Sequence, residues 1–358
     1  MGMRRRSLLS WPLACALAAC GAAVADPPLA TLASRRQLLW GTALQGKDLQ
    51  DPALRGLISE QVSAITPENA LKWDATEPQP GRFSLGPAEE LLLFARTHGK
   101  AVRGHTLLWH QQLPGWLNPL PATALRAALE RHVRTLARHW RGQIHTWDAI
   151  NEPIADRGDG LRQSLWLQRL GPAVFADVLR WAHEADPSAR LAINEYGLEG
   201  DDPQTVRKRQ ALLDLVRELQ RQRAPLHVIG LQAHLLAPSQ GSARFSSLPS
   251  FLRQLRQLGL EVQITELDVS DRQLPADPRL RDAAVAATYA AFLRTVLAEP
   301  AVTLVGTWGL SDRDTWLNQA FPRSDGLPQR PLPYASDLHT KPARSSIAAS
   351  LSQPRSTP

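Results

Sequence analysis

The chain has almost no cysteine: its 358 residues include only Cys15 and Cys20. Both lie in the N-terminal stretch that we interpret below as an export signal, so the rest of the chain has no thiol with which to form a disulfide. Its stability must therefore come from a hydrophobic core. A mature chain of about 330 residues is ample for such a core, and this length fits one large α/β barrel better than several small domains.

Other signatures are also missing. The chain has no Cys/His metal cluster, no glycine-rich phosphate loop and no nucleotide fingerprint, so we predict no metal and no cofactor. The net charge is +7, but the arginines are spread along helical stretches such as 207–209 and 217–223 and do not alternate with aromatic residues. This pattern favours a solvated, arginine-rich surface, and we predict no nucleic-acid partner.

Residues 1–25 have the features of an export signal. Arginines at 4–6 form a positive start, residues 8–19 form an apolar segment too short to span a bilayer, and Ala25 ends a small-residue cleavage site. Two alternatives stay open, namely a twin-arginine signal and lipidation of Cys20, which follows a sequence similar to a bacterial lipobox. We predict cleavage after Ala25, an exported protein (periplasmic or extracellular) and no transmembrane segment, with a lipid anchor at Cys20 as the alternative.

Apolar stretches of strand length alternate with amphipathic helical stretches along the rest of the chain. The expected strands are 38–43, 61–66, 100–105, 144–151, 190–195, 227–232, 261–266 and 303–308. Helical spacing of apolar residues marks segments between them, such as 121–140 and 205–222, and a last helix at 345–351. This alternation, without a repeat or a linker, predicts an α/β fold: a single-domain (β/α)8 TIM barrel over residues 26–352, followed by a polar tail at 353–358.

Polar residues gather where the expected strands end, which is where barrel enzymes have their active sites. Two of these strands end in a glutamate, Glu152 and Glu266. Alternate strands point both carboxyl groups into one cleft, and two carboxyl groups about 5–5.5 Å apart are the requirement for a retaining glycosidase. Either glutamate alone could be a solvated strand end. The amides, histidines and tryptophans at the other strand ends favour a carbohydrate ligand, because amides bind hydroxyl groups and indoles stack on sugar faces.

Six strings occur in order along the chain: TPENALKW, RGHTLLWH, WDAINEP, LQAHL, ITELD and TWGLSD. Together they closely resemble the xylanases of glycoside hydrolase family 10, and the resemblance runs from Gly41 to Ala343. It implies a retaining endo-β-1,4-xylanase that needs no cofactor, acts on xylan or xylooligosaccharides and is a monomer.

The resemblance also implies a role for individual residues. Glu152 matches the general acid/base of the family, and Glu266 matches the nucleophile. The residues that would bind the substrate are Glu68, Asn69, Lys72, His105, Trp109, Asn151, Tyr196, Gln232, His234, Trp308 and Trp316, with Asp268 behind His234. Outside this set, we expect His110 to be structural and Trp73, Trp147 and Trp181 to lie in the core.

One segment departs from the family pattern. The fifth strand usually ends in Asn-Asp-Tyr-Asn, whereas here it ends in Asn194-Glu195-Tyr196-Gly197. We expect a looser binding site on the leaving-group side.

Three other functions stay open from the sequence. The first is glucanase, cellobiosidase or mannanase activity in a related barrel. The second is a non-catalytic carbohydrate-binding barrel. The third, a metal hydrolase that uses His105, His234 and Asp268, has the least support.

Overall fold

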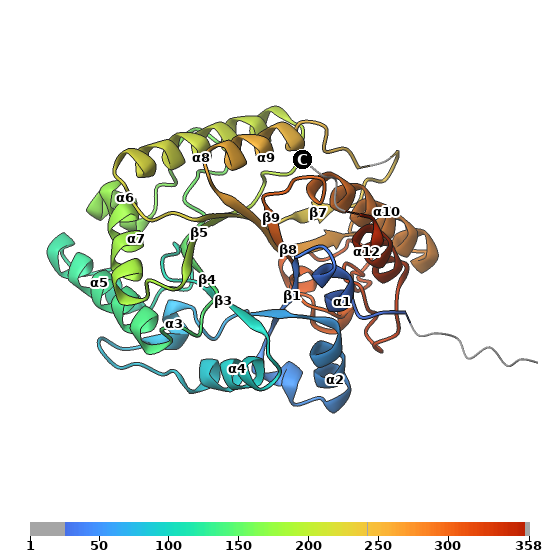
Figure 1. Cartoon of the computed structure of the whole chain (residues 1–358), viewed down its shortest axis with the longest axis horizontal. Coiled ribbons are helices and arrows are strands. Elements are labelled where there is room, and N and C mark those ends of the chain that lie inside the picture. The colour runs from blue at the N-terminus through green and yellow to red at the C-terminus, as the bar shows by residue number, and fades with distance from the viewer. Residues whose placement is uncertain (1–25, 242, 355–358) are drawn as a thin grey trace, which may run out of the picture.

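The computed structural model of this chain describes residues 26–241 and 243–354. In this described part, eight parallel strands form a closed barrel (Figure 1). The barrel strands are β1 (Leu39–Leu44), β2 (Ala64–Pro67), β3 (Ala101–His105), β4 (Thr146–Asn151), β5 (Arg190–Glu195), β6 (Val228–Leu231), β8 (Glu261–Ser270) and β9 (Val302–Thr307). Each pairs with the next in this order, and β9 pairs with β1 to close the ring. The predicted TIM barrel is confirmed.

Helices follow the strands and surround the barrel (Figure 1). The outer helices are α2 (Pro52–Gln61), α4 (Gly86–Thr97), α5 (Ala122–His139), α7 (Ala173–Ala185), α8 (Pro203–Arg221), α9 (Leu248–Gln257), α10 (Pro278–Val296) and α12 (Pro342–Ser352). They form because apolar residues recur at helical spacing, as in α5, where Leu125, Leu129 and Val133 are buried. In α8, Asp202 caps the first turn by accepting the backbone N–H groups of Gln204 and Thr205.

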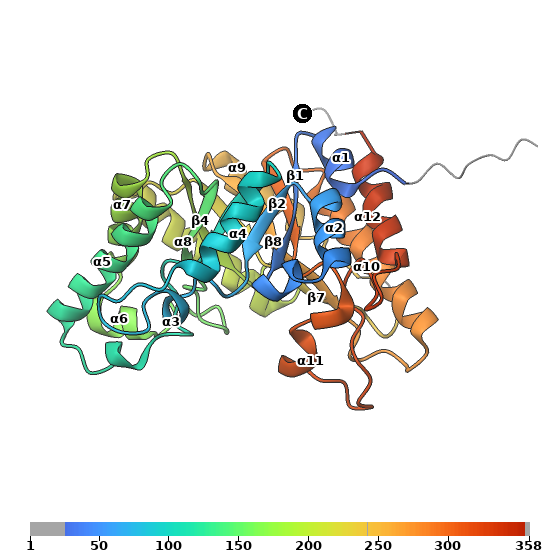
Figure 2. The same ribbon diagram turned by 90° about the horizontal axis from the view of Figure 1, so that it is seen from below.

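Short elements lie at the two ends of the barrel (Figure 2). Helix α1 (Leu29–Ser34) precedes β1 and packs against α12 at one end. At the other end, the loops after the strands carry α3 (Trp73–Thr76), α6 (Leu165–Leu170), α11 (Leu317–Ala320) and the 3-10 turns Gly46–Leu49, Gly115–Leu117 and Asp312–Asp314. The loops at this second end form the cleft described below.

One strand was not predicted from the sequence. Strand β8 continues beyond Glu266 to Ser270, and β7 (His234–Leu236) pairs with this extension in parallel. The pairing brings His234 opposite Asp268. A ladder of three residues is too short to give a clear pattern in the sequence, yet it fixes His234 next to the carboxyl end of β8.

Two glycines leave room for large neighbours inside the barrel. A Cβ at Gly104 on β3 would lie 2.2 Å from the ring of Trp147, so only glycine fits beside this indole. A Cβ at Gly230 on β6 would lie 2.4 Å from Oδ1 of Asn194. Trp147 is buried, as are Trp73 and Trp181, and the prediction that these three tryptophans belong to the core is confirmed.

The predicted signal, residues 1–25, lies outside the described residues, so its cleavage site and the fate of Cys20 stay predictions. Most of the predicted tail, residues 355–358, lies outside them as well. Among the residues that the structure describes, no helix is both long enough and apolar enough to cross a membrane.

Candidate active site

A cleft of about 640 Å³ opens at the carboxyl ends of the barrel strands. The structure brings nearly all the sequence-predicted site residues to its walls: Glu68, Lys72, His105, Trp109, Asn151, Glu152, Tyr196, Gln232, His234, Glu266, Asp268, Trp308 and Trp316. The remaining one, Asn69, lies directly behind the wall and accepts a hydrogen bond from Lys72. Residues that are far apart in the sequence therefore form one polar site.

Glu152 follows the last residue of β4 and is fixed at both its backbone and its side chain. Its φ of 56° is unusual for a residue with a Cβ, and such a conformation persists only when neighbouring contacts hold it. The contacts here are a 2.8 Å bond from its N–H to the Asn194 carbonyl and a 2.9 Å bond from Nε of Arg162 to its own carbonyl. Its carboxylate accepts hydrogen bonds from Nε1 of Trp109 at 2.8 Å and from Nε2 of Gln232 at 3.1 Å.

Glu266, in the middle of β8, is buried and also accepts two hydrogen bonds. Asn194 Nδ2 donates to Oε1 at 2.7 Å, and His234 Nε2 lies 3.1 Å from Oε2. Burial raises the pKa of Glu266, but the bond from His234 and the positive charge around it outweigh burial, so the pKa is lowered. Glu266 is therefore a carboxylate whose neighbours favour its ionised form although it is buried.

His234 supplies much of this positive charge. Burial lowers the pKa of His234, yet the pKa is raised well above its usual value because Asp268 and Glu266 both favour the imidazolium. Nδ1 of His234 lies 3.0 Å from Asp268, whose second oxygen accepts a 2.8 Å bond from Nε1 of Trp316. The cation at His234 and the wall residue Trp316 are thus held by the same aspartate.

Asn194 was not predicted from the sequence as a site residue. Asn194 connects Glu266 with Asn151, the residue before Glu152. Its Nδ2 donates both to Glu266 and, at 2.8 Å, to Oδ1 of Asn151, while its own Oδ1 accepts a 2.7 Å bond from Thr265. The bond from Asn194 fixes the amide of Asn151, whose Nδ2 is buried and has no partner among the described residues. The position of Asn194 near the end of an apolar strand was the available signal.

A second polar group lines one end of the cleft. Lys72 is buried and donates to Asn69 at 2.9 Å and to Gln112 at 2.7 Å. Burial lowers the pKa of Lys72, although the negative charges of Glu266 and Glu68 oppose this shift. Lys72 therefore lies in the wall of the site and does not extend to the outer surface.

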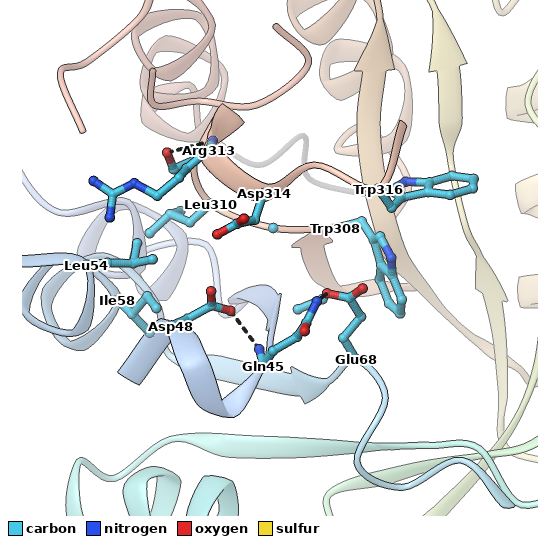
Figure 3. A pocket seen from close by; sticks show the side chains of 13 residues that line it. Gln45, Asp48, Leu54, Ile58, Glu68, Trp308, Leu310, Arg313, Asp314 and Trp316 are labelled. Atoms are coloured by element: carbon cyan, nitrogen blue, oxygen red, sulfur yellow. Dashed lines mark hydrogen bonds between the residues drawn. The ribbon is translucent and has the colours of Figure 1, made fainter. Parts of the chain in front are cut away.

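Glu68 is held from the other side by a residue that the sequence did not single out. Gln45 donates to Glu68 at 3.0 Å. Figure 3 shows these two side chains pointing toward one another, with Trp308 next to Glu68 and Asp48 on the other side of Gln45. Gln45 and Gln112 both lie in loops after strands, where a single glutamine gives no pattern.

His105 is fixed by a buried aspartate that also lies on a strand. Nδ1 of His105 lies 3.0 Å from Asp148, which is bonded in addition to Arg103. The ring of His105 meets Trp308 edge-on at 5.3 Å between ring centroids. His110, which we expected to be structural, lies with Nδ1 3.8 Å from Oε2 of Glu152, so it belongs to the surroundings of this carboxylate.

Tyr196 on the opposite side of the cleft is held by charged groups. Its hydroxyl donates to Asp156 and accepts a 2.8 Å bond from Arg162. Nζ of Lys208 lies 3.5 Å from the centre of its ring and 2.9 Å from Glu195, which is buried. These contacts fix the Tyr196 side chain, and the expected looseness of sugar binding on the leaving-group side stays a prediction.

The described residues include no group of three or more histidine, cysteine, aspartate or glutamate side chains that could hold a metal ion. His105 and His234 each pair with their own aspartate. The geometry therefore gives no support to the metal-hydrolase alternative.

A closed (β/α)8 barrel with two buried glutamates in a polar, tryptophan-lined cleft defines the chain as a barrel glycosidase. The model of Glycosyl hydrolase family 10 matches residues 28–350, and the chain belongs to this family.

Known xylanases are similar to this chain in sequence and in structure over most of its length. An endo-1,4-beta-xylanase of Agaricus bisporus is 34% identical over 91% of this chain and 95% of its own length. A beta-1,4-xylanase of Dictyoglomus thermophilum is 36% identical over 73% of this chain and 74% of its own. The crystal structure of xylanase 10B from Thermotoga maritima matches with a TM-score of 0.84 and 29% identity, over 90% of this chain and 98% of that one.

Proposed function

We propose that this protein is an endo-1,4-β-xylanase that cleaves xylan by double displacement with retention of the anomeric configuration. The observation that carries the proposal is the different surroundings of the two glutamates in one cleft. Glu266 is stabilised as an anion by His234 and Asn194. Glu152 is bonded by the neutral donors Trp109 and Gln232, and burial lowers the pKa of His110, whose Nδ1 lies 3.8 Å from it. Retaining glycosidases divide their two carboxyl groups in this way.

In the first step, a carboxylate oxygen of Glu266 attacks C1 of the sugar. The bond from C1 to the glycosidic oxygen breaks, and Glu152 gives its proton to that oxygen, so the shortened xylan leaves as an alcohol. A covalent glycosyl ester of Glu266 remains. Because esterification removes the negative charge of Glu266, Glu152 is now the anion that the site favours.

In the second step, Glu152 takes a proton from a water molecule. The resulting hydroxide attacks C1 from the side that the leaving group vacated, and the ester bond to Glu266 breaks. Two inversions restore the original configuration. Glu266 returns as a carboxylate and Glu152 as an acid, so the cycle closes without a cofactor.

The other cleft residues would bind the sugars. The unused Nδ2 of Asn151 is a buried donor for the 2-hydroxyl of the sugar that is attacked. Glu68, Asn69, Lys72 and His105 offer the polar groups for the other hydroxyls of the sugars on this side. Trp109, Trp308 and Trp316 supply flat apolar faces, and Tyr196 takes the sugar on the leaving-group side.

Parallel assays test the substrate and the stereochemistry. We expect reducing sugar from xylan, with much less from carboxymethylcellulose or mannan, and mixed xylooligosaccharides from the first minutes of reaction. Proton NMR of the first products should show the β-anomer. Faster release from a glucan or a mannan would reassign the substrate to the related activities, and a first product of α configuration would contradict the double displacement. Tight xylan binding without turnover would support the non-catalytic alternative.

We also infer that residues 1–25 direct export and are removed, and that the mature protein is a monomer. N-terminal mass spectrometry of the exported protein should give Asp26 as its first residue. Recovery of the protein in the membrane fraction, and its release by Cys20→Ala, would support the lipid anchor instead. Light scattering should give the mass of one chain.

A further inference from the structure

The rim of the cleft beyond Trp316 carries an arginine that the proposed reaction does not use. Arg272 follows β8, lines the cleft and is exposed. Its guanidinium lies 5.1 Å from the centre of the Phe321 ring, and among the described residues no carboxylate forms an ion pair with it. A planar cation spread over an aromatic ring keeps its N–H groups free at the edges, where they can bind a carboxylate with two parallel hydrogen bonds.

Three other arginines of this part of the molecule already form ion pairs with aspartates. Arg281 pairs with Asp271, Arg323 with Asp325, and Arg330 with Asp282. Inside the cleft, the cation Lys72 is buried and bonded to Asn69 and Gln112. Arg272 is thus the cationic group of the described cleft wall that is both accessible and unpaired.

Elsewhere in the cleft, the cationic side chains already have partners. His234 lies between Asp268 and Glu266, and Lys72 donates to Asn69 and Gln112. The carboxylates Glu68, Glu266 and Asp268 line the same part of the cleft. A carboxylate on the substrate is therefore favoured most near the unpaired cation of Arg272.

The aromatic and apolar neighbours of Arg272 complete a surface for a sugar ring. Phe321 is 44% exposed, and its ring lies 5.6 Å from that of Trp316, which borders the catalytic network through Asp268. Leu236 on β7, 38% exposed, also lines the cleft. Contacts lead from Arg272 to Phe321, from Phe321 to Trp316 and from Trp316 to His234, so we infer that a group bound at Arg272 lies to the side of the bond that is cleaved.

We propose that Arg272 and Phe321 form a binding site for a uronic acid branch on the polysaccharide, with the carboxylate on the guanidinium and the sugar ring against Phe321 and Leu236. The inference rests on the proposed xylanase function. It adds an acidic branch to the substrates that this cleft prefers.

The test compares a xylan that carries uronic acid branches with the same polymer after chemical reduction of its carboxyl groups. For Arg272→Met, we expect the ratio of kcat/KM on the acidic polymer to kcat/KM on the reduced polymer to fall about two- to fivefold at low salt, the range for an exposed ion pair. The loss should shrink as salt is raised, because ions screen an exposed pair. Arg272→Lys should lose less, and Phe321→Ala should lower binding of the acidic product oligosaccharides.

Arg253→Met is the matched control, because Arg253 is exposed on α9 and does not line the cleft. An equal ratio for wild type and Arg272→Met would overturn the proposal, as would a loss that salt does not change. A failure of the xylanase proposal has a different signature, since the wild type would then cleave neither polymer. In that case, calorimetric titration measures the affinity of the protein for an acidic xylooligosaccharide and for its reduced counterpart, and this test of the inference requires no catalysis. Equal affinity for the two ligands contradicts it.

Discussion

At the scale of single residues, the chemistry of this cleft depends on which carboxylate holds a charge. Glu266 stands between an imidazolium and an amide that is itself fixed by Thr265. Glu152 is held by an indole and an amide, and its backbone is fixed by Arg162. Two identical side chains therefore differ because their neighbours differ, and substitutions that change the neighbours should change the reaction in distinct ways.

Glu266→Ala should abolish hydrolysis of xylan and respond to a small anion. Azide fits the vacated space and attacks C1 while Glu152 still supplies a proton, so added azide should restore part of the rate. A single displacement inverts C1, and NMR should therefore identify an α-glycosyl azide from a β-linked substrate. Undiminished activity in a folded variant would contradict the nucleophile assignment.

Glu152→Ala should affect substrates according to their leaving groups. A sugar alcohol needs a proton to depart, so cleavage of xylooligosaccharides should slow by about 10²–10⁴-fold. A dinitrophenyl xylobioside needs little protonation, so its first step should slow far less, and a burst of phenolate should precede slow turnover. The alkaline limb of the pH profile should vanish. Equal slowing of both substrates would leave Glu152 as a binding residue, and Glu68 would be the next candidate for the acid.

His234→Gln should move the acid limb of kcat/KM to higher pH. The enzyme needs Glu266 as an anion, and activity is lost as the pH falls through the pKa of Glu266. Burial raises this pKa, and the bond from His234 is the largest of the effects that lower it. Removal of the imidazolium therefore leaves burial opposed only by smaller effects, such as the charge of His105 and the bond from Asn194. The variant should therefore lose activity at a higher pH than the wild type. His183→Gln, on α7 and outside the cleft, should leave the limb in place.

At the scale of helices and strands, the sequence predicts what periodicity controls. The expected barrel strands are all present, and 190–195 agrees with β5 residue for residue. The candidate site residues could be predicted at the ends of these strands, because polar residues that follow a buried apolar run are easy to recognise in the sequence. Short elements with no period of their own, such as β7 and α11, were not predicted.

The contacts between elements were equally out of reach of the sequence. Asn194 was visible as a residue near a strand end, but its two donated bonds depend on Gly230 leaving space beside it. The roles of Gln45, Gln112 and Arg162 depend on how loops fold over the rim. No local pattern encodes such contacts, because each partner lies on another strand or loop.

The loop from β4 to α6 offers a test at this scale. Arg162 joins the Glu152 carbonyl, Asp156 and Tyr196, so it positions the residue that we propose as the acid. Arg162→Met should lower kcat/KM on xylooligosaccharides about tenfold, since the loss of one or two hydrogen bonds costs roughly 1–2 kcal/mol.

A comparison of substrates with different leaving groups tests whether Arg162 positions Glu152 or only stabilises the loop. If Arg162 acts through Glu152, the loss in Arg162→Met should be much smaller on the dinitrophenyl substrate than on xylooligosaccharides. Arg157→Met is the matched control in the same loop, because Arg157 is exposed and only its backbone carbonyl is bonded. Similar losses in the two variants would exclude a positioning role for Arg162.

At the scale of the whole molecule, the two ends of the described chain meet. Strand β9 pairs with β1, and α12 packs against α1 and α10. Arg344 on α12 is buried, and it donates to the Pro27 carbonyl at 2.7 Å and to the Asp26 carboxylate at 2.8 Å. A barrel without disulfides is thus closed by a strand pair, by packed helices and by buried arginines, since Arg36 after α1 also donates to the carbonyls of Leu297 and Gln353.

Arg344→Met should therefore destabilise the barrel without changing its chemistry. The substitution removes hydrogen bonds that a buried cation makes to Asp26 and Pro27, and it leaves the Pro27 carbonyl without its donor. Such a loss costs about 1–3 kcal/mol, which for a domain of this size is a fall of a few degrees in Tm. Arg294→Met, an exposed arginine on the neighbouring α10, should stay within about 0.5 kcal/mol of the wild type. Urea unfolding followed by tryptophan fluorescence measures both variants, and kcat/KM on xylan well below Tm should be equal in the three proteins. Equal stability of Arg344→Met and Arg294→Met would mean that the strand pair, the helix packing and Arg36 close the barrel without Arg344.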